Sequence, residues 1–192
     1  MRIRIYSITK HIAALVLFLA FLLGMRWAWS ELFASTEHPG AVQGVLDLRG
    51  LDMGSSLPVN LDGEWEFYPG AFVTHDDLKR QPADGMRYVR VPGDWRDAFP
   101  GEPNTSFGYG TYRLTIRVAP GPDQPYTFWI KDIQASSAVE INGQLAAEFG
   151  TVAERAESYR PKNVSYTAAY TAGDATQIEL LIRVANFDQP NV

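Results

Sequence analysis

The chain has 192 residues, of which 46% are hydrophobic and 12% aromatic, and it contains no cysteine. This length supports one substantial core plus an appendage, while the lack of cysteine excludes disulfides, a thiolate nucleophile and a cysteine-ligated zinc site. Residues 1–39 carry a net charge of +2 and the remainder carries −7, and this acidic body argues against nucleic-acid binding, which needs a basic patch.

The first predicted element is an apolar helix near the N-terminus. Residues 12–25 contain no charged side chain, and Arg2, Arg4 and Lys10 precede them. A basic region followed by an apolar segment is typical of a secretory signal peptide or an uncleaved signal anchor.

Both interpretations of this segment stay open, with the anchor favoured. A cleavage site needs small residues directly after the apolar run, whereas bulky residues separate it from the nearest candidate, which ends at Ala34. Extended to Trp29, the run spans about 27 Å as a helix, and Trp27 and Trp29 suit the membrane interface. The positive-inside rule then places the N-terminus in the cytoplasm and the body outside it. We therefore expect a protein of the bacterial inner (cytoplasmic) membrane with a periplasmic body.

The remaining sequence divides into a linker and one domain. We assign residues 1–33 to the anchor or signal peptide, 34–44 to a linker of small and polar residues, and 45–192 to a single domain. Short strand patterns open this domain at 45–48, 64–67 and 88–91, and glycine and proline pairs close the last two.

Two longer segments, 111–118 and 177–184, alternate between apolar and polar positions, as half-buried strands do. Between them we predict a strand at 126–130 and a hairpin at 139–145. The hairpin turn contains Asn142-Gly143, the preferred pair for a type I′ turn.

Seven or eight strands with irregular connections predict an all-β antiparallel sandwich preceded by one N-terminal helix. Only the segments 73–86 and 151–160 could hold short helices within this domain.

The stretch LDGEWEFYPG, residues 61–70, raises a question about catalysis. In a strand Glu64 and Glu66 share one face, with carboxylates about 6–8 Å apart, which overlaps the spacing of an inverting glycosidase. The favoured alternative is a solvent-exposed face opposite Trp65 and Phe67, whose side chains would pack into the core.

Other catalytic signatures are missing from the sequence. His11, His38 and His75 are the only histidines, and their spacing matches no zinc motif. The sequence also lacks a G-x-S-x-G nucleophile motif. We therefore expect no metal, no cofactor and no catalytic residue.

The order of several motifs resembles that of a known sandwich. These motifs are LDGEWEF (61–67), VPGDW (91–95), GYGTYRL (108–114), VEING (139–143) and LLIRVANF (180–187). Together they resemble the galactose-binding-like jelly roll that begins family 2 glycoside hydrolases. LDLRG (46–50), Pro161 and VANF (184–187) make the chain more similar to the extracytoplasmic N-terminal domain of bacterial seven-transmembrane receptors with diverse intracellular signalling modules.

The resemblance covers about residues 44–188 and implies a galactose-binding-like jelly-roll β-sandwich that senses a ligand without being an enzyme. In such receptors a seven-helix membrane region and a histidine kinase or diguanylate cyclase output follow. This chain ends at Val192, so we expect a fragment or a truncated form. A carbohydrate-binding module of a glycoside hydrolase is the alternative, and an anchored enzyme that uses Glu64 or Glu66 is a third hypothesis.

Candidate ligand-binding residues follow from how sugar-binding jelly rolls work, with aromatic faces next to planar polar groups. Trp129 alternates with Phe128 and Ile130 and should point away from their face. We expect the candidates to converge at one rim; they are Trp95, Arg96, Asn104, Tyr109, Trp129, Tyr159 and Arg160. In the alternative, Trp95 fills the core and Trp129 packs under a loop. The expected partner is a small molecule, with a carbohydrate favoured, or another protein.

Overall fold

The structure is a computed structural model of the chain. It describes residues 2–32, 39–51, 58–80, 84–99, 105–121, 125–131, 133 and 135–188. The chain forms two compact units, Met1–His38 and Pro39–Val192, and each is considered by itself.

The first unit is the predicted helix, α1 (Arg2–Leu32). Its segment His11–Trp29 has a mean hydropathy of 2.0, and none of it is buried in the structure. These 19 residues would span about 28 Å at 1.5 Å per residue, close to the ~30 Å hydrocarbon core of a bilayer. The helix therefore suits a membrane anchor or a signal sequence.

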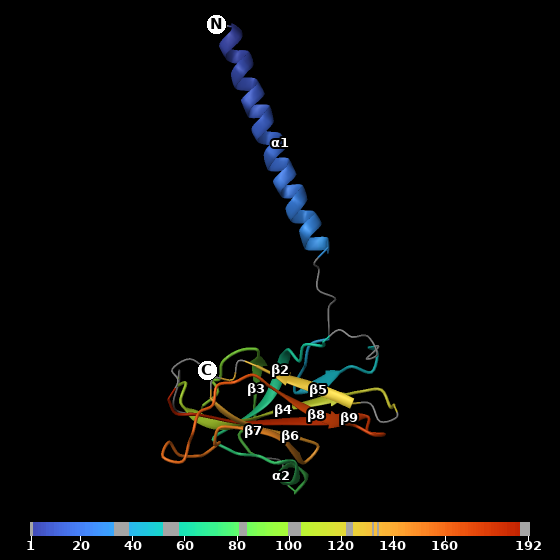
Figure 1. The fold of residues 1–192 in the computed structure, drawn as a ribbon, viewed down its shortest axis with the longest axis vertical. Helices are drawn as coiled ribbons and strands as arrows, with labels where there is room; N and C mark the ends of the chain where they lie inside the picture. Colours follow the sequence, from blue (N-terminus) through green and yellow to red (C-terminus); the bar gives the residue numbers. More distant parts are fainter. Residues whose placement is uncertain are drawn as a thin grey trace. The chain divides into compact units, whose positions relative to one another are not determined.

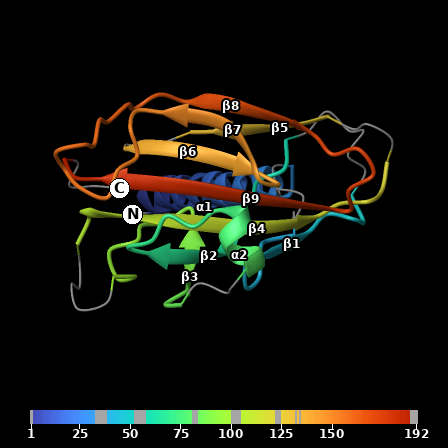
Figure 2. The same ribbon diagram turned by 90° about the horizontal axis from the view of Figure 1, so that it is seen from below.

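The second unit is a β-sandwich of two sheets, shown in Figure 1 and, from below, in Figure 2. The large sheet has the strand order β3-β2-β4-β9-β6-β7, with β1 also paired to β4, and the small sheet contains β5 and β8. The strand bounds are β1 Val45–Asp47, β2 Gly63–Pro69, β3 Arg87–Val91, β4 Gly108–Arg117, β5 Pro125–Ile130, β6 Ser136–Ile141, β7 Gln144–Phe149, β8 Tyr166–Thr171 and β9 Gln177–Asn186. The predicted all-β sandwich behind one apolar helix is confirmed.

The longest pairing in the large sheet joins β4 and β9. They run antiparallel over ten residue pairs, from Gly108 opposite Asn186 to Arg117 opposite Gln177. On the inner face one apolar row crosses four strands through Phe67, Tyr112, Ile182 and Val139. From this row, Val139, Tyr112 and Ile182 pack against the small sheet and so contribute to the main core. The small sheet contributes four buried side chains to it: Phe128, Ile130, Tyr166 and Ala168.

A second, smaller core cluster is aromatic. The ring of Phe67 lies 5.6 Å from Trp95 and 5.9 Å from Phe99, and Trp95 stacks on Tyr112 at 6.3 Å. Gly110 is required here, because a Cβ atom at that position would lie 2.6 Å from the Phe67 ring. Such tilted and stacked pairs add stabilisation beyond the apolar area that they bury.

The turns and short helices that connect the strands match the sequence predictions only in part. Asn142 and Gly143 have φ angles of 47° and 83°, which fit the predicted type I′ turn. The helix α2 (His75–Arg80) lies within the predicted 73–86 segment, whereas 151–160 forms turns and no helix. β8 has no counterpart among the predicted strands, because its sequence YTAAYT alternates only weakly between apolar and polar residues.

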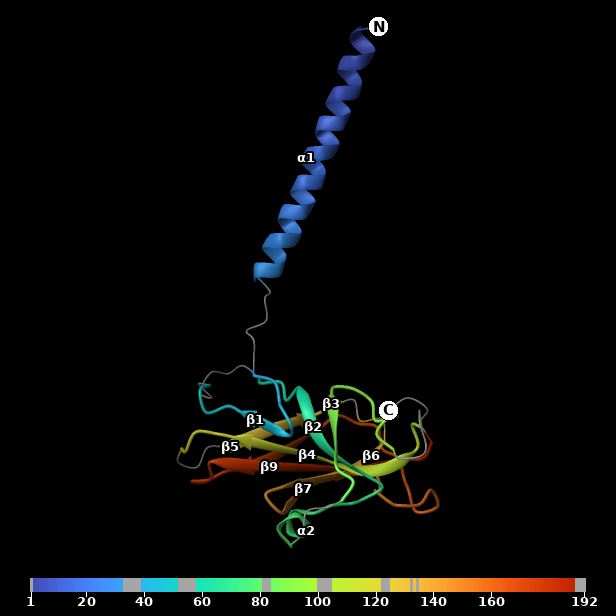
Figure 3. The same cartoon turned by 180° about the vertical axis from the view of Figure 1, so that it is seen from behind.

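The segment before β1 also contacts the sandwich. Ala41 forms a bridge with Gly63, and the backbone oxygen of Gly44 accepts a hydrogen bond from the Thr115 amide at 2.8 Å. These contacts lie beside β1, which runs parallel to the second half of β4 (Figure 3).

We expect Phe67→Ala to destabilise the sandwich strongly, because Phe67 is fully buried and contacts three other rings. The expected loss in free energy of unfolding is about 3–5 kcal/mol. Urea unfolding of the full chain in detergent, followed by circular dichroism, measures it. The control Tyr88→Ala, at a 45% exposed position on β3, should cost far less; equal losses would contradict the core assignment.

Candidate functional site

The two glutamates of β2 have different surroundings. Trp65 and Phe67 alternate with these glutamates along the strand and are buried on its opposite face, as the favoured interpretation predicts. Glu64 accepts a hydrogen bond from the Gln43 amide at 3.2 Å. Glu66 accepts from Arg113 Nη1 at 2.9 Å and from the Tyr68 hydroxyl at 2.8 Å.

The prediction that both carboxylates face solvent is wrong for Glu66, whose side chain is only 15% exposed. Arg113, Tyr68 and the Gly44 backbone enclose it. Both hydrogen bonds, from the arginine and from the phenol, fall on Oε2 of Glu66, so the Glu64 and Glu66 carboxylates have different surroundings.

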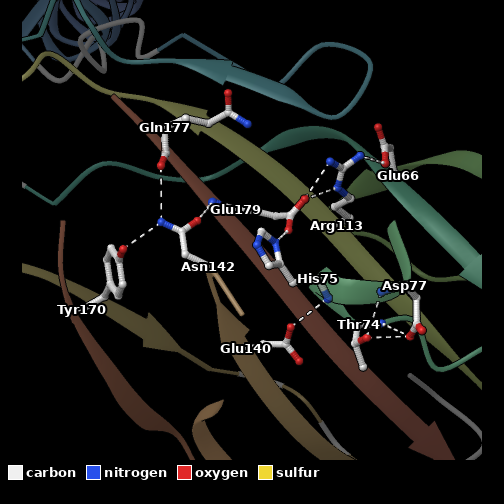
Figure 4. A network of polar contacts seen from close by, with 10 residues as sticks. All are labelled: Glu66, Thr74, His75, Asp77, Arg113, Glu140, Asn142, Tyr170, Gln177 and Glu179. Carbon is white, nitrogen blue, oxygen red and sulfur yellow. Dashed lines mark hydrogen bonds and ion pairs between the residues drawn. The ribbon is translucent and has the colours of Figure 1, made fainter. Parts of the chain in front are cut away.

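Arg113 extends these contacts into a network across the outer face of the large sheet (Figure 4). Its Nε donates to Glu179 Oε1 at 2.8 Å. The other oxygen of Glu179 pairs with His75 Nδ1, and the His75 amide donates to Glu140 Oε1 at 2.9 Å. Glu179 and Glu140 therefore fix the start of α2 on the face opposite the small sheet (Figure 2).

Asn142 connects the same network to the small sheet. Its Oδ1 accepts from the Glu179 amide at 2.7 Å, and its Nδ2 donates to the Tyr170 hydroxyl at 2.8 Å. Asn142 thus serves both as a turn residue with positive φ and as a link between β6, β9 and β8.

The network raises the pKa values of two of its members, Arg113 and Tyr68. Burial lowers the pKa of Arg113, but its hydrogen bonds to Glu66 and Glu179 outweigh this effect and raise the pKa overall. Burial, followed by the hydrogen bond to Glu66, raises the pKa of Tyr68 to about 12. Arg113 therefore stays charged and Tyr68 stays protonated, which suits structural support better than proton transfer.

Several predicted ligand-binding residues lie near the end of β9. Trp95 Nε1 donates to the Ser106 carbonyl at 3.2 Å, Tyr109 pairs with Ala185, and the Tyr159 hydroxyl donates to Asp188 at 2.9 Å. Trp95 is 1% exposed and Tyr159 is also buried, so both are enclosed by protein. Asn104 lies outside the described residues.

The two predicted arginines have local partners. Arg96 pairs with Asp94 at 2.6 Å, and this hydrogen bond lowers the pKa of the Asp94 carboxyl. Arg160 Nη1 donates to the carbonyl of Tyr159 at 2.6 Å. The Arg96 side chain is 43% exposed, and Arg160 is an exposed residue. Contact with a ligand remains a prediction for all these positions.

Trp129 differs from the other candidates because 67% of its surface is exposed. The pairing of β5 with β8 sets it opposite Thr167, and Thr127 and Ala169 form the adjacent pair on the same face. Lys131 Nζ lies 5.2 Å from the centre of its ring. The result is an aromatic surface with hydroxyl and ammonium groups around it, on the outer face of the small sheet.

No protein-family model matches the chain, and neither does any curated protein. Among solved structures, the chain is similar to Faecalibacterium prausnitzii β-glucuronidase, with 17% identity over 68% of this chain and a TM-score of 0.51. A β-glucuronidase of an uncultured Clostridium species and a GH2 β-galacturonidase of Eisenbergiella tayi match 69% and 67% of the chain. Their identities are 15% and 12%, and their TM-scores are 0.48 and 0.42.

The match spans 21%, 24% and 19% of these three proteins, respectively. The first similarity supports the fold, and the predicted all-β antiparallel sandwich is confirmed.

We expect Arg113→Met to destabilise the fold by about 2–3 kcal/mol, because it leaves Glu66 and Glu179 without their shared cation. This is below the ~3–5 kcal/mol of a fully buried pair, since the Arg113 side chain is 24% exposed. Urea unfolding measures the loss. The control Arg117→Met removes the same charge at an exposed position on the same strand, and an equally large effect there would refute the role of the network.

Tyr68 predicts a change of stability at alkaline pH. The folded chain keeps its phenol protonated up to about pH 12, whereas the unfolded phenol ionises near pH 10. Its contribution is therefore complete below about pH 10 and is lost as the pH rises toward 12. Between about pH 10 and 12, the free energy of unfolding of Tyr68→Phe should fall by about 2–3 kcal/mol less than that of the natural chain. Urea unfolding at several pH values measures this difference. Parallel curves for the two proteins would contradict this.

Proposed function

We propose that this chain is the ligand-sensing part of a membrane signalling receptor. In this proposal α1 anchors it in the inner membrane, and the sandwich lies outside the cytoplasm and binds a carbohydrate without hydrolysing it. The apolar helix and its preceding basic residues support the anchor. The order of motifs from about 44 to 188 supports the receptor.

The observation that carries the ligand proposal is the exposed indole of Trp129. The indole is 67% exposed, and the strand that carries it is paired along its length with β8, so a ligand could stack on the ring without displacing the backbone. The C–H face of a pyranose ring suits stacking on indole. Thr127, Thr167 and Lys131 would supply partners for the sugar hydroxyls.

The environment of Glu66 supports a binding role over a hydrolytic one. A general acid must release its proton to substrate and a general base must accept one, yet Glu66 is held between Arg113 and Tyr68. A second candidate function, a carbohydrate-binding module of a glycoside hydrolase, is favoured by the similarity of fold to part of a β-glucuronidase.

Trp129→Ala should weaken carbohydrate binding at least about tenfold, which corresponds to about 1.4 kcal/mol of stacking. The full chain in detergent is titrated with a panel of neutral and acidic oligosaccharides, and calorimetry measures binding. The control Tyr88→Ala, which removes an exposed ring from β3, should leave binding unchanged. Unaltered binding by Trp129→Ala, or no binding to any sugar, would contradict the carbohydrate site. Chromatographic detection of released sugar would contradict the non-enzymatic role.

A further inference from the structure

A small pocket opens on the outer face of the large sheet. Its volume is about 210 Å³, below the ~300–1,000 Å³ of pockets for drug-sized ligands. Ala138 lies at its centre, paired with Arg183 of β9 on one side and with Glu148 of β7 on the other. Three apolar side chains complete the lining: Phe72, Leu145 and Val152. Phe72 itself packs against Tyr109, with ring centres 4.8 Å apart.

Arg183 is poorly satisfied by the protein. Its side chain is 24% exposed, and its nearest carboxylate oxygen, Glu140 Oε2, is 3.8 Å away, beyond hydrogen-bond distance. Its Nε is buried and has no hydrogen-bond partner among the described residues. A buried donor without a partner is costly, and the part of the Arg183 side chain that lines the pocket is 24% exposed and open to a hydrogen-bond acceptor.

The charges around the pocket select the kind of ligand. Arg183 and Glu148 line the same pocket without forming an ion pair within the described part of the chain. They lie two strands apart, about 9–10 Å between backbones, with only the small side chain of Ala138 between them.

Glu140 lies close to Arg183, and the charge of Arg183 also contributes to the lowered pKa of Asp77, after the hydrogen bonds from Thr74. A simple anion would therefore meet the negative field of Glu140, Glu148 and Asp77. A simple cation would meet Arg183. A ligand with one charge of each sign avoids both costs.

We propose that this pocket binds a free α-amino acid with an apolar side chain. The carboxylate would accept hydrogen bonds from the Arg183 guanidinium, whose planar fork suits a carboxylate. The ammonium would donate to Glu148. The side chain would contact Phe72, Leu145 and Val152. This site goes beyond the proposed carbohydrate function, because Trp129 lies on the outer face of the other sheet.

L-leucine is the probe for this site, with the full chain in detergent and calorimetry as the measurement. Isocaproate lacks the ammonium and isopentylamine lacks the carboxylate, so both should bind at least about tenfold more weakly than leucine. Equal binding of isocaproate would indicate a plain anion site and overturn the proposal, as would failure of leucine to bind.

Variants separate the two charges. Arg183→Gln and Glu148→Gln should each weaken leucine binding at least about tenfold. Glu148 is exposed, so its variant remains informative even if Arg183→Gln fails to fold. The control Glu154→Gln, an exposed glutamate in the adjacent loop, should bind leucine normally. Unchanged binding by the folded Glu148→Gln variant would overturn the proposal. Trp129→Ala should leave leucine binding intact, which distinguishes this site from the carbohydrate site.

Discussion

The ten-residue antiparallel pairing of β4 with β9 is the constraint on which the sandwich depends. These strands are the two central members of the large sheet, and their register decides which side chains meet on each face. On the inner face it aligns Tyr112 with Ile182 and Leu114 with Leu180, and so produces the apolar rows that the small sheet covers. A shift by one residue would turn these rows toward solvent and bury the charged face.

The same register organises the outer face. It brings Arg113 of β4 within reach of Glu179 of β9, and the adjacent pairing with β2 brings Glu66 to the other side of Arg113. Once Glu179 is in place, its free oxygen holds His75 and thereby the start of α2. The segment that precedes α2 includes Phe72, which forms one wall of the small pocket. Charge pairing between strands thus positions a loop that takes no part in either sheet.

Sequence reasoning succeeded where a pattern is local. Alternation in 111–118 and 177–184 predicts β4 and β9, and Asn142-Gly143 predicts the turn between β6 and β7, because these signals depend on neighbouring residues alone. The Arg113 network could not be predicted, since it depends on which strands become neighbours. An arginine and a glutamate on solvent-facing positions give no sign of pairing until the strand order is known.

For the candidate site, too, only the features that depend on local sequence could be predicted. The alternating pattern correctly predicted that Trp129 points away from the face of Phe128 and Ile130. The loop residues had no such rule, and Trp95 and Tyr159 proved to be enclosed by tertiary contacts. The pocket was absent from the prediction because its opposed charges, Arg183 and Glu148, are far apart in sequence and meet only across Ala138.

The distribution of the five tryptophans gives the molecule its own optical probes. Trp27 and Trp29 belong to the apolar helix, Trp65 and Trp95 are buried in the sandwich, and Trp129 is largely exposed. A water-soluble quencher would reach Trp129 without penetrating the core, whereas a lipid-borne quencher would reach the helix residues if that helix enters a bilayer. Emission from this chain can therefore be divided into helix, core and surface components without any added label.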